Sequence, residues 1–166
     1  MSRNIALSLI VAAFAVGAVV AQQDGLLQPT MEPTGGWTSS AKVGQPGDWS
    51  ATTVAAGVAK KPLDGKSVTI VGEVVDLSCY LQLGKHGAAH AACGSKCIAA
   101  GEAIGIVTKT GDVYLAMAEE HDARRDGKTT FRKVAADNFA KVITVTGTTT
   151  TANGIKTIYV QGYATT

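Results

Sequence analysis

Three cysteines and a histidine, Cys79, His90, Cys93 and Cys97, lie in one short stretch that holds every cysteine of the chain. If residues 88–100 are helical, steps of three and four residues place His90, Cys93 and Cys97 on one face of that helix. Cys79, on the preceding segment, could complete a set of four ligands. Three thiolates and one imidazole suit a tetrahedral zinc site or a soft copper(I) site. The sequence therefore predicts a transition-metal site, for zinc or copper.

The same cysteines allow a second interpretation. Paired cysteine ligands of zinc are usually separated by two residues. Here the two cysteines are separated by three (Cys-x3-Cys), and the two-residue gap lies between a histidine and a cysteine (His-x2-Cys). A disulfide joining Cys79 to Cys93 or Cys97 would staple the predicted helix to the strand before it. Cys93 and Cys97 are poor partners for each other, because a regular helix misdirects their Cβ atoms. The sequence leaves the metal site and the disulfide as alternatives.

Two further side chains near this motif are candidates for supporting roles. Asp76 lies three residues before Cys79, where it either orients a ligand from outside the metal shell or ends a strand as a turn residue. His86 lies one helical turn before His90, but Gly84 and Gly87 indicate a loop there. We expect an exposed imidazole or an exchangeable ligand at that position. No nucleophile elbow or Cys-x-x-Cys pair is present, so no enzyme is predicted.

The first 21 residues have the pattern of a signal peptide. A charged start is followed by an apolar run from Ile5 to Val20 and by small residues before Gln22. The apolar run is short for a membrane span, so we expect cleavage and no stable span afterwards. The predicted compartment is the periplasm or the exterior. Oxidising compartments favour disulfides, and an odd number of cysteines there requires a free thiol, an interchain bridge or a metal.

The amino-acid composition differs on the two sides of residue 65. Residues 22–65 are rich in Gly, Pro, Ser and Thr, and they contain all four prolines and both tryptophans, Trp37 and Trp49. This segment is predicted to be a flexible linker, with the tryptophans packing back on the following domain. The formal net charge is +2, and the basic residues form no continuous stripe. Nucleic acid is therefore not an expected partner.

Residues 66–166 have the pattern of a single, mainly β domain. β-Branched residues predict strands over 66–76, 104–109, 113–117, 141–148 and 155–163, and Asn153-Gly154 is a strong hairpin signal. Helical patterns cover 88–100, which ends at Gly101, and 126–140. Five strands, a short inserted helix that carries the Cys/His motif and a second short helix predict an OB-like Greek-key barrel. Glycines within the strands would allow the barrel to curl.

Two motifs in this domain resemble those of a group of small exported bacterial proteins. The motifs are Gly-Glu-Val-Val-Asp-x-x-Cys-Tyr at residues 72–80 and His-x-x-Cys-x-x-x-Cys at residues 90–97, followed by Gly101. The resemblance covers the chain from about Lys66 to its end. It implies an OB-like β-barrel with a Cys/His cluster, and it implies no particular activity.

These observations predict two functions of different classes. The first is an exported domain that binds zinc or copper through Cys79, His90, Cys93 and Cys97, in a structural or metal-handling role. The second is a disulfide-stapled OB-type interaction module without a metal, whose barrel face would bind a peptide, a glycan or an envelope protein. Because such barrels have many ligands, the fold alone does not choose between them.

Overall fold

The computed structural model describes residues 32–119, 121 and 131–161. The predicted signal peptide over residues 1–21, the first ten residues of the predicted linker and residues 126–130 of the second predicted helix lie outside the described residues.

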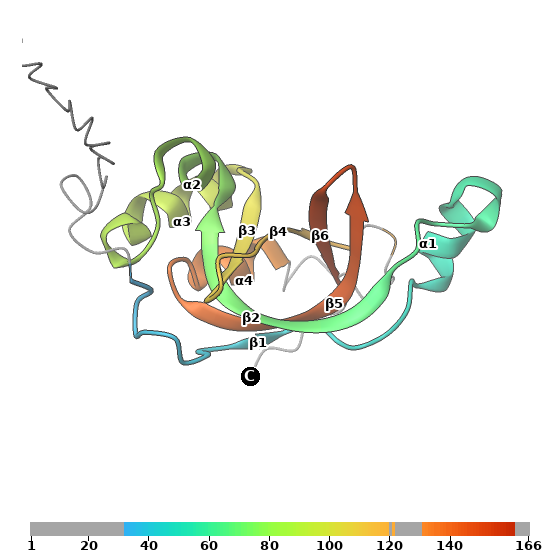
Figure 1. Ribbon diagram of the computed structural model, residues 1–166, viewed down its shortest axis with the longest axis horizontal. Helices are drawn as coiled ribbons and strands as arrows, with labels where there is room; N and C mark the ends of the chain where they lie inside the picture. The colour runs from blue at the N-terminus through green and yellow to red at the C-terminus, as the bar shows by residue number, and fades with distance from the viewer. Residues whose placement is uncertain (1–31, 120, 122–130, 162–166) are drawn as a thin grey trace, which may run out of the picture.

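A closed, five-stranded mixed β-barrel forms the centre of the molecule (Figure 1). The strand order is β5-β2-β3-β4-β6, and pairing of β5 with β6 closes the barrel. Neighbouring strands are antiparallel except β4 and β6, which are parallel. The prediction of a mainly β, five-stranded barrel is confirmed. The strands are β2 (Lys66–Asp76), β3 (Ile104–Thr108), β4 (Val113–Ala118), β5 (Val142–Ala152) and β6 (Ile155–Val160).

The two longest strands, β2 and β5, bend around the barrel together (Figure 1). Gly147 of β5 pairs with Val160 of β6, and a Cβ atom at Gly147 would be 2.2 Å from the carbonyl oxygen of Tyr159. Glycine is therefore required for the close approach of β5 to β6. The β5–β6 hairpin turns at Asn153 and Gly154, which both have positive φ, as the Asn-Gly signal predicts.

Residues 32–65, the described part of the predicted linker, contact the barrel at several places. β1 (Lys42–Val43) pairs in parallel with β5, opposite Thr144 and Val145. Two short helices follow, α1 (Ala51–Ala56) and η1 (Val58–Lys60). Trp49 packs edge-on against Tyr159 of β6 with ring centroids 5.1 Å apart, so the predicted packing of a tryptophan on the domain is confirmed for this residue.

Short helices lie at both ends of the barrel. Between β2 and β3 lie α2 (Leu77–Leu83), η2 (Ala88–His90) and α3 (Ala91–Ala100), and between β4 and β5 lies α4 (Phe131–Asp137). Figure 1 shows α2 and α3 at one end of the barrel and α1 at the other. The helix predicted over 88–100 is present as η2 and α3 and ends at Gly101 as expected, while α2 was not predicted.

The core fills the barrel and continues beneath the helices. Ile98 of α3 and Phe131 of α4 are buried with the inward-facing residues of the strands. Ser95 and Arg132 join the two helices, since Ser95 Oγ donates to the carbonyl of Ala136 and Arg132 donates to the carbonyl of Ile98. Within the described residues, no helix is both long and apolar enough to cross a membrane.

Candidate metal centre

Asp76 connects the barrel to the helices that carry the cysteines. It is the last residue of β2 and the N-cap of α2, where its Oδ1 accepts hydrogen bonds from the backbone N–H groups of Ser78 (2.8 Å) and Cys79 (3.3 Å). Aspartate is among the best residues for this capping role. The cap fixes the first turn of α2, and it therefore places Cys79 beside the carboxylate that caps it.

His90 approaches the same place from the other side of the helical insertion. It ends η2 and precedes the first residue of α3, and its side chain is buried. The imidazole packs edge-on against Phe139, with ring centroids 5.6 Å apart. His90 follows Cys79 by eleven residues in the chain, and the turn between α2 and α3 brings the two side chains close together.

The donor atoms of Asp76, Cys79 and His90 all lie within 4.8 Å of one another. One side-chain atom of each of the two non-sulfur residues, Asp76 Oδ2 and His90 Nε2, is buried and has no hydrogen-bond partner among the described residues. An unsatisfied buried polar group costs on the order of 1–3 kcal/mol. A carboxylate oxygen, a thiol and an imidazole nitrogen that lie this close together form a site that a cation could satisfy.

Burial sets the protonation of the donors. It raises the pKa of the Cys79 thiol above its ordinary value, and the adjacent Asp76 carboxylate raises this pKa further. Burial also lowers the pKa of His90 below its ordinary value. At neutral pH the imidazole is therefore neutral and ready to bind a metal, whereas Cys79 is a thiol that must lose a proton to do so.

Cys93 and Cys97 form a second thiol pair beside this group. Cys93 is exposed and Cys97 is half-buried, and Cys93 is near enough to raise the pKa of Cys97. The pKa of Cys97 is raised by burial first, then by Cys93, and also by the charges of Asp76 and Cys79. All three cysteines are free thiols in the structure. Cys93 and Cys97 are thus neighbours of the three convergent donors without belonging to that set.

His86 was expected to be an exposed imidazole or an exchangeable ligand, and in the structure its side chain is 18% exposed and contacts Glu73. Its Nδ1 lies 2.9 Å from Oε2 of Glu73, a buried residue of β2. Oε1 of the same carboxylate accepts a hydrogen bond of 2.7 Å from the backbone N–H of Gly87. Burial raises the pKa of Glu73, although both of these contacts act in the opposite direction. Through its contacts with His86 and Gly87, Glu73 therefore holds the loop between α2 and His90 in position.

Sequence reasoning placed Asp76 outside the metal shell and overlooked Glu73. The structure places an oxygen of Asp76 among the donors themselves, because one oxygen caps α2 and the other is left without a partner. The signal for Glu73 was present in the sequence as a carboxylate within an otherwise apolar run of β2. A charged residue in such a run is rarely buried unless it is paired.

No protein-family model matches this chain, and no match was found among curated proteins or solved structures.

Proposed function

We propose that this protein is an exported domain that binds a transition metal at Asp76, Cys79 and His90, with a thiol of the neighbouring pair as a further ligand. The observation that carries the proposal is the convergence of these three donors while Asp76 Oδ2 and His90 Nε2 are buried and unpartnered. A metal ion would give both atoms a partner and would add its binding free energy to the stability of the fold.

Zinc is the favoured ion. Zinc accepts carboxylate oxygen, imidazole nitrogen and thiolate sulfur in one tetrahedral site, whereas copper(I) prefers the softer thiolates. A zinc ion at Asp76, Cys79 and His90 needs one more ligand for a closed structural site, and Cys97 is the half-buried candidate. A copper(I) ion would instead use the three thiols and leave Asp76 unbound.

The proposed scaffold is an OB-like Greek-key barrel. The order β5-β2-β3-β4-β6, with β4 and β6 as the one parallel pair in the barrel, supports this assignment. In such barrels the connection between the first two strands commonly contributes to ligand binding. Here that connection, from β2 to β3, holds α2, η2 and α3 and hence every proposed ligand except Asp76, which is the last residue of β2.

The test is metal titration of the full chain, purified without chelators, with zinc, cobalt(II) and copper(I). Cobalt reports tetrahedral thiolate coordination in its visible spectrum. Cys79→Ser and His90→Gln should weaken zinc binding by more than the roughly 10- to 100-fold that loss of an outer-shell partner costs. His121→Gln, at a histidine outside the proposed site, is the matched control and should bind as the parent does.

Asp76→Asn separates the two roles of this residue. Asparagine is as good an N-cap as aspartate, so α2 should begin normally while the metal loses an anionic ligand. We expect weaker zinc binding and little change in copper(I) binding. Absence of bound metal at micromolar concentrations, together with one free thiol before reduction and three after, would favour the disulfide-stapled module and contradict this proposal.

A further inference from the structure

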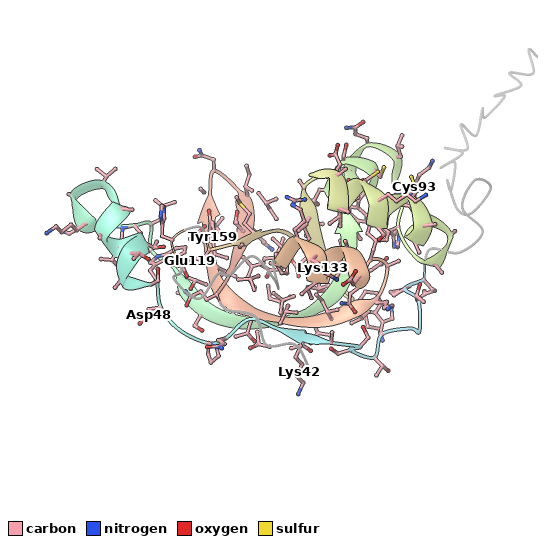
Figure 2. All side chains as sticks on the ribbon, turned by 180° about the vertical axis from the view of Figure 1, so that it is seen from behind. Lys42, Asp48, Cys93, Glu119, Lys133 and Tyr159 are labelled. Carbon is pink, nitrogen blue, oxygen red and sulfur yellow. The ribbon has the colours of Figure 1, made fainter. Side chains whose placement is uncertain are left out.

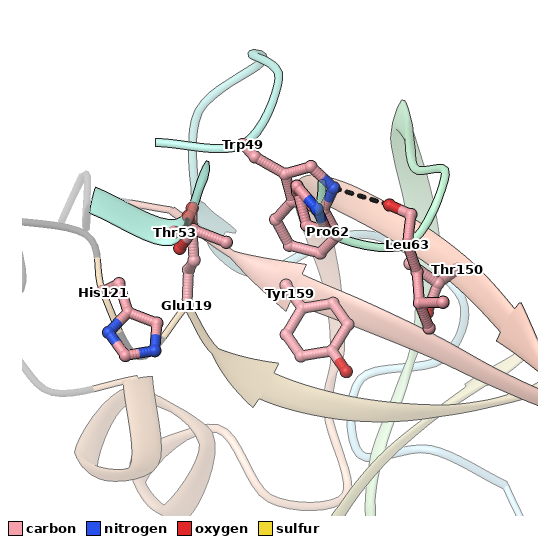
Figure 3. Close-up of a pocket in the computed structure, with 8 residues that line it drawn as sticks. All are labelled: Trp49, Thr53, Pro62, Leu63, Glu119, His121, Thr150 and Tyr159. Atoms are coloured by element: carbon pink, nitrogen blue, oxygen red, sulfur yellow. Dashed lines mark hydrogen bonds between the residues drawn. The ribbon is translucent and has the colours of Figure 1, made fainter. Parts of the chain in front are cut away.

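A separate cavity lies between the segment 49–63 and the barrel, at the end opposite the proposed metal centre. Figure 2 shows Glu119 and Tyr159 at one end of the molecule and Cys93 at the other. The cavity has a volume of about 240 Å³. Its walls include Trp49, Thr53 and Leu63 from the segment, and Glu119, Thr150 and Tyr159 from the barrel (Figure 3).

Two aromatic rings give this cavity a fixed wall. Trp49 meets Tyr159 at an interplanar angle of 66°. The indole N–H of Trp49 donates a 2.9 Å hydrogen bond to the carbonyl of Leu63, drawn as the dashed line in Figure 3. The indole nitrogen of Trp49 already has a hydrogen-bond partner. A ligand at Trp49 would therefore contact the apolar ring. Aromatic faces attract cations within about 6 Å of the ring centre.

Glu119 supplies a negative charge at the edge of the same cavity. Its side chain is 1% exposed. Oε1 accepts a hydrogen bond from the backbone N–H of Ser50 (2.9 Å) and another from the Thr53 hydroxyl. Oε2 is buried and has no hydrogen-bond partner among the described residues. Burying a carboxylate oxygen without a donor is costly, and a donor carried by a ligand would remove that cost.

We propose that this cavity binds a small organic cation, a primary ammonium on one ring or a short apolar chain. The ammonium group would donate to Oε2 of Glu119, and the apolar part would lie against Trp49 and Tyr159. A cavity of about 150 Å³ holds a benzene molecule, so the larger volume here accommodates one ring with a short chain. The carboxylate selects a cation over a neutral molecule or an anion of the same shape.

The test uses benzylammonium, benzyl alcohol and benzoate as probes of matched shape. The chain contains two tryptophans, so a Trp37→Phe variant leaves Trp49 as the sole indole fluorophore beside the cavity. We expect saturable quenching by benzylammonium, with an affinity at least tenfold higher than for benzyl alcohol, and no response to benzoate. Equal responses to the three probes, or no saturable response to any of them, would overturn the proposal.

A Glu119→Gln substitution in this background removes the charge but keeps an oxygen for Ser50 and Thr53. We expect the preference for benzylammonium over benzyl alcohol to fall to about threefold or less, while Tyr159→Phe, which retains the ring, should preserve it. If Glu119→Gln does not fold, the selectivity of the parent among the three probes still decides the question. The titrations are run with and without a chelator, so their outcome is independent of the proposed metal site.

Discussion

The protonation of individual residues gives the proposed metal site a defined pH dependence. The pKa of His90 is lowered, so its imidazole is already neutral at pH 7 and releases no proton when a metal binds. The pKa values of Cys79 and Cys97 are raised, so each thiol that becomes a ligand releases one. Zinc affinity should therefore rise about tenfold per pH unit for each thiolate ligand between pH 7 and 8.5.

Competition titrations with a chromophoric chelator at several pH values measure the slope of log zinc affinity against pH. A slope of two would match Cys79 together with one member of the Cys93 and Cys97 pair, and Cys97→Ser should then lower the slope to one. An affinity that does not change over this range would contradict thiolate ligation. An affinity that changes only below pH 6.5 would assign the titration to His90 instead.

Glu73 is a positioning residue rather than a ligand, and its removal should act through the loop. Glu73→Ala frees Gly87 and His86, so we expect zinc affinity to fall by about 10- to 100-fold. Glu73→Gln keeps an acceptor for Gly87, and its affinity should stay within about threefold of the parent. Cobalt(II) spectra should keep the parent's ligand field in both variants. A changed cobalt spectrum in Glu73→Ala would show that the ligand set itself depends on Glu73.

At the scale of elements, the packing of α3 depends on Gly94. A Cβ atom at this position would lie 1.9 Å from Cζ of Phe139, the ring that also packs against His90. Gly94→Ala should gain about 1 kcal/mol of helix propensity but lose more through overpacking, which typically costs 1–3 kcal/mol. The net result expected in urea unfolding is a less stable protein.

Phe139→Leu supplies the control for this prediction, because a smaller side chain makes room for the added methyl group. The double variant should therefore be more stable than the sum of the two single changes predicts. If Gly94→Ala alone is as stable as the parent, the contact between α3 and Phe139 is looser than the structure indicates.

Elements whose signals are local could be predicted from the sequence, and those that depend on distant contacts could not. The β5–β6 hairpin follows from Asn153 and Gly154, because their positive φ angles are a property of the turn itself. The seven-residue helix α2 was missed, although Asp76 and Gly84 are suitable cap residues at its two ends. So short a helix is stable only because it packs against the rest of the protein.

The same distinction applies to the proposed site. The spacing of His90, Cys93 and Cys97 predicted that they share one face if residues 88–100 are helical, and in the structure His90 is the N-cap of α3, which contains both cysteines. The sequence could not show that Asp76 uses one oxygen as a cap and leaves the other buried beside His90. The composition of residues 32–65 predicted that a tryptophan packs on the barrel, but it could not show which residue Trp49 contacts, since Tyr159 lies more than a hundred residues away.

At the scale of the whole molecule, Cys93 beside the proposed metal centre and Tyr159, against which Trp49 packs, lie at opposite ends of the molecule (Figure 2). Zinc at 100 times its Kd should stabilise the protein by about 2.7 kcal/mol. Trp49→Ala removes an aromatic contact with Tyr159 and a hydrogen bond to Leu63, so it should destabilise the protein. Because Trp49 is only half-buried, the loss should be smaller than the roughly 3–5 kcal/mol typical of a fully buried tryptophan.

The two effects should be additive, because changes at separated sites without shared partners usually combine to within about 0.5 kcal/mol. Urea unfolding of the parent and of Trp49→Ala, each with excess zinc and with a chelator, completes the thermodynamic cycle. The increase in the free energy of unfolding that zinc causes should be the same in both proteins. A difference above about 1 kcal/mol would instead mean that the strands joining the two ends, β2 and β5 above all, transmit metal binding to the segment around Trp49.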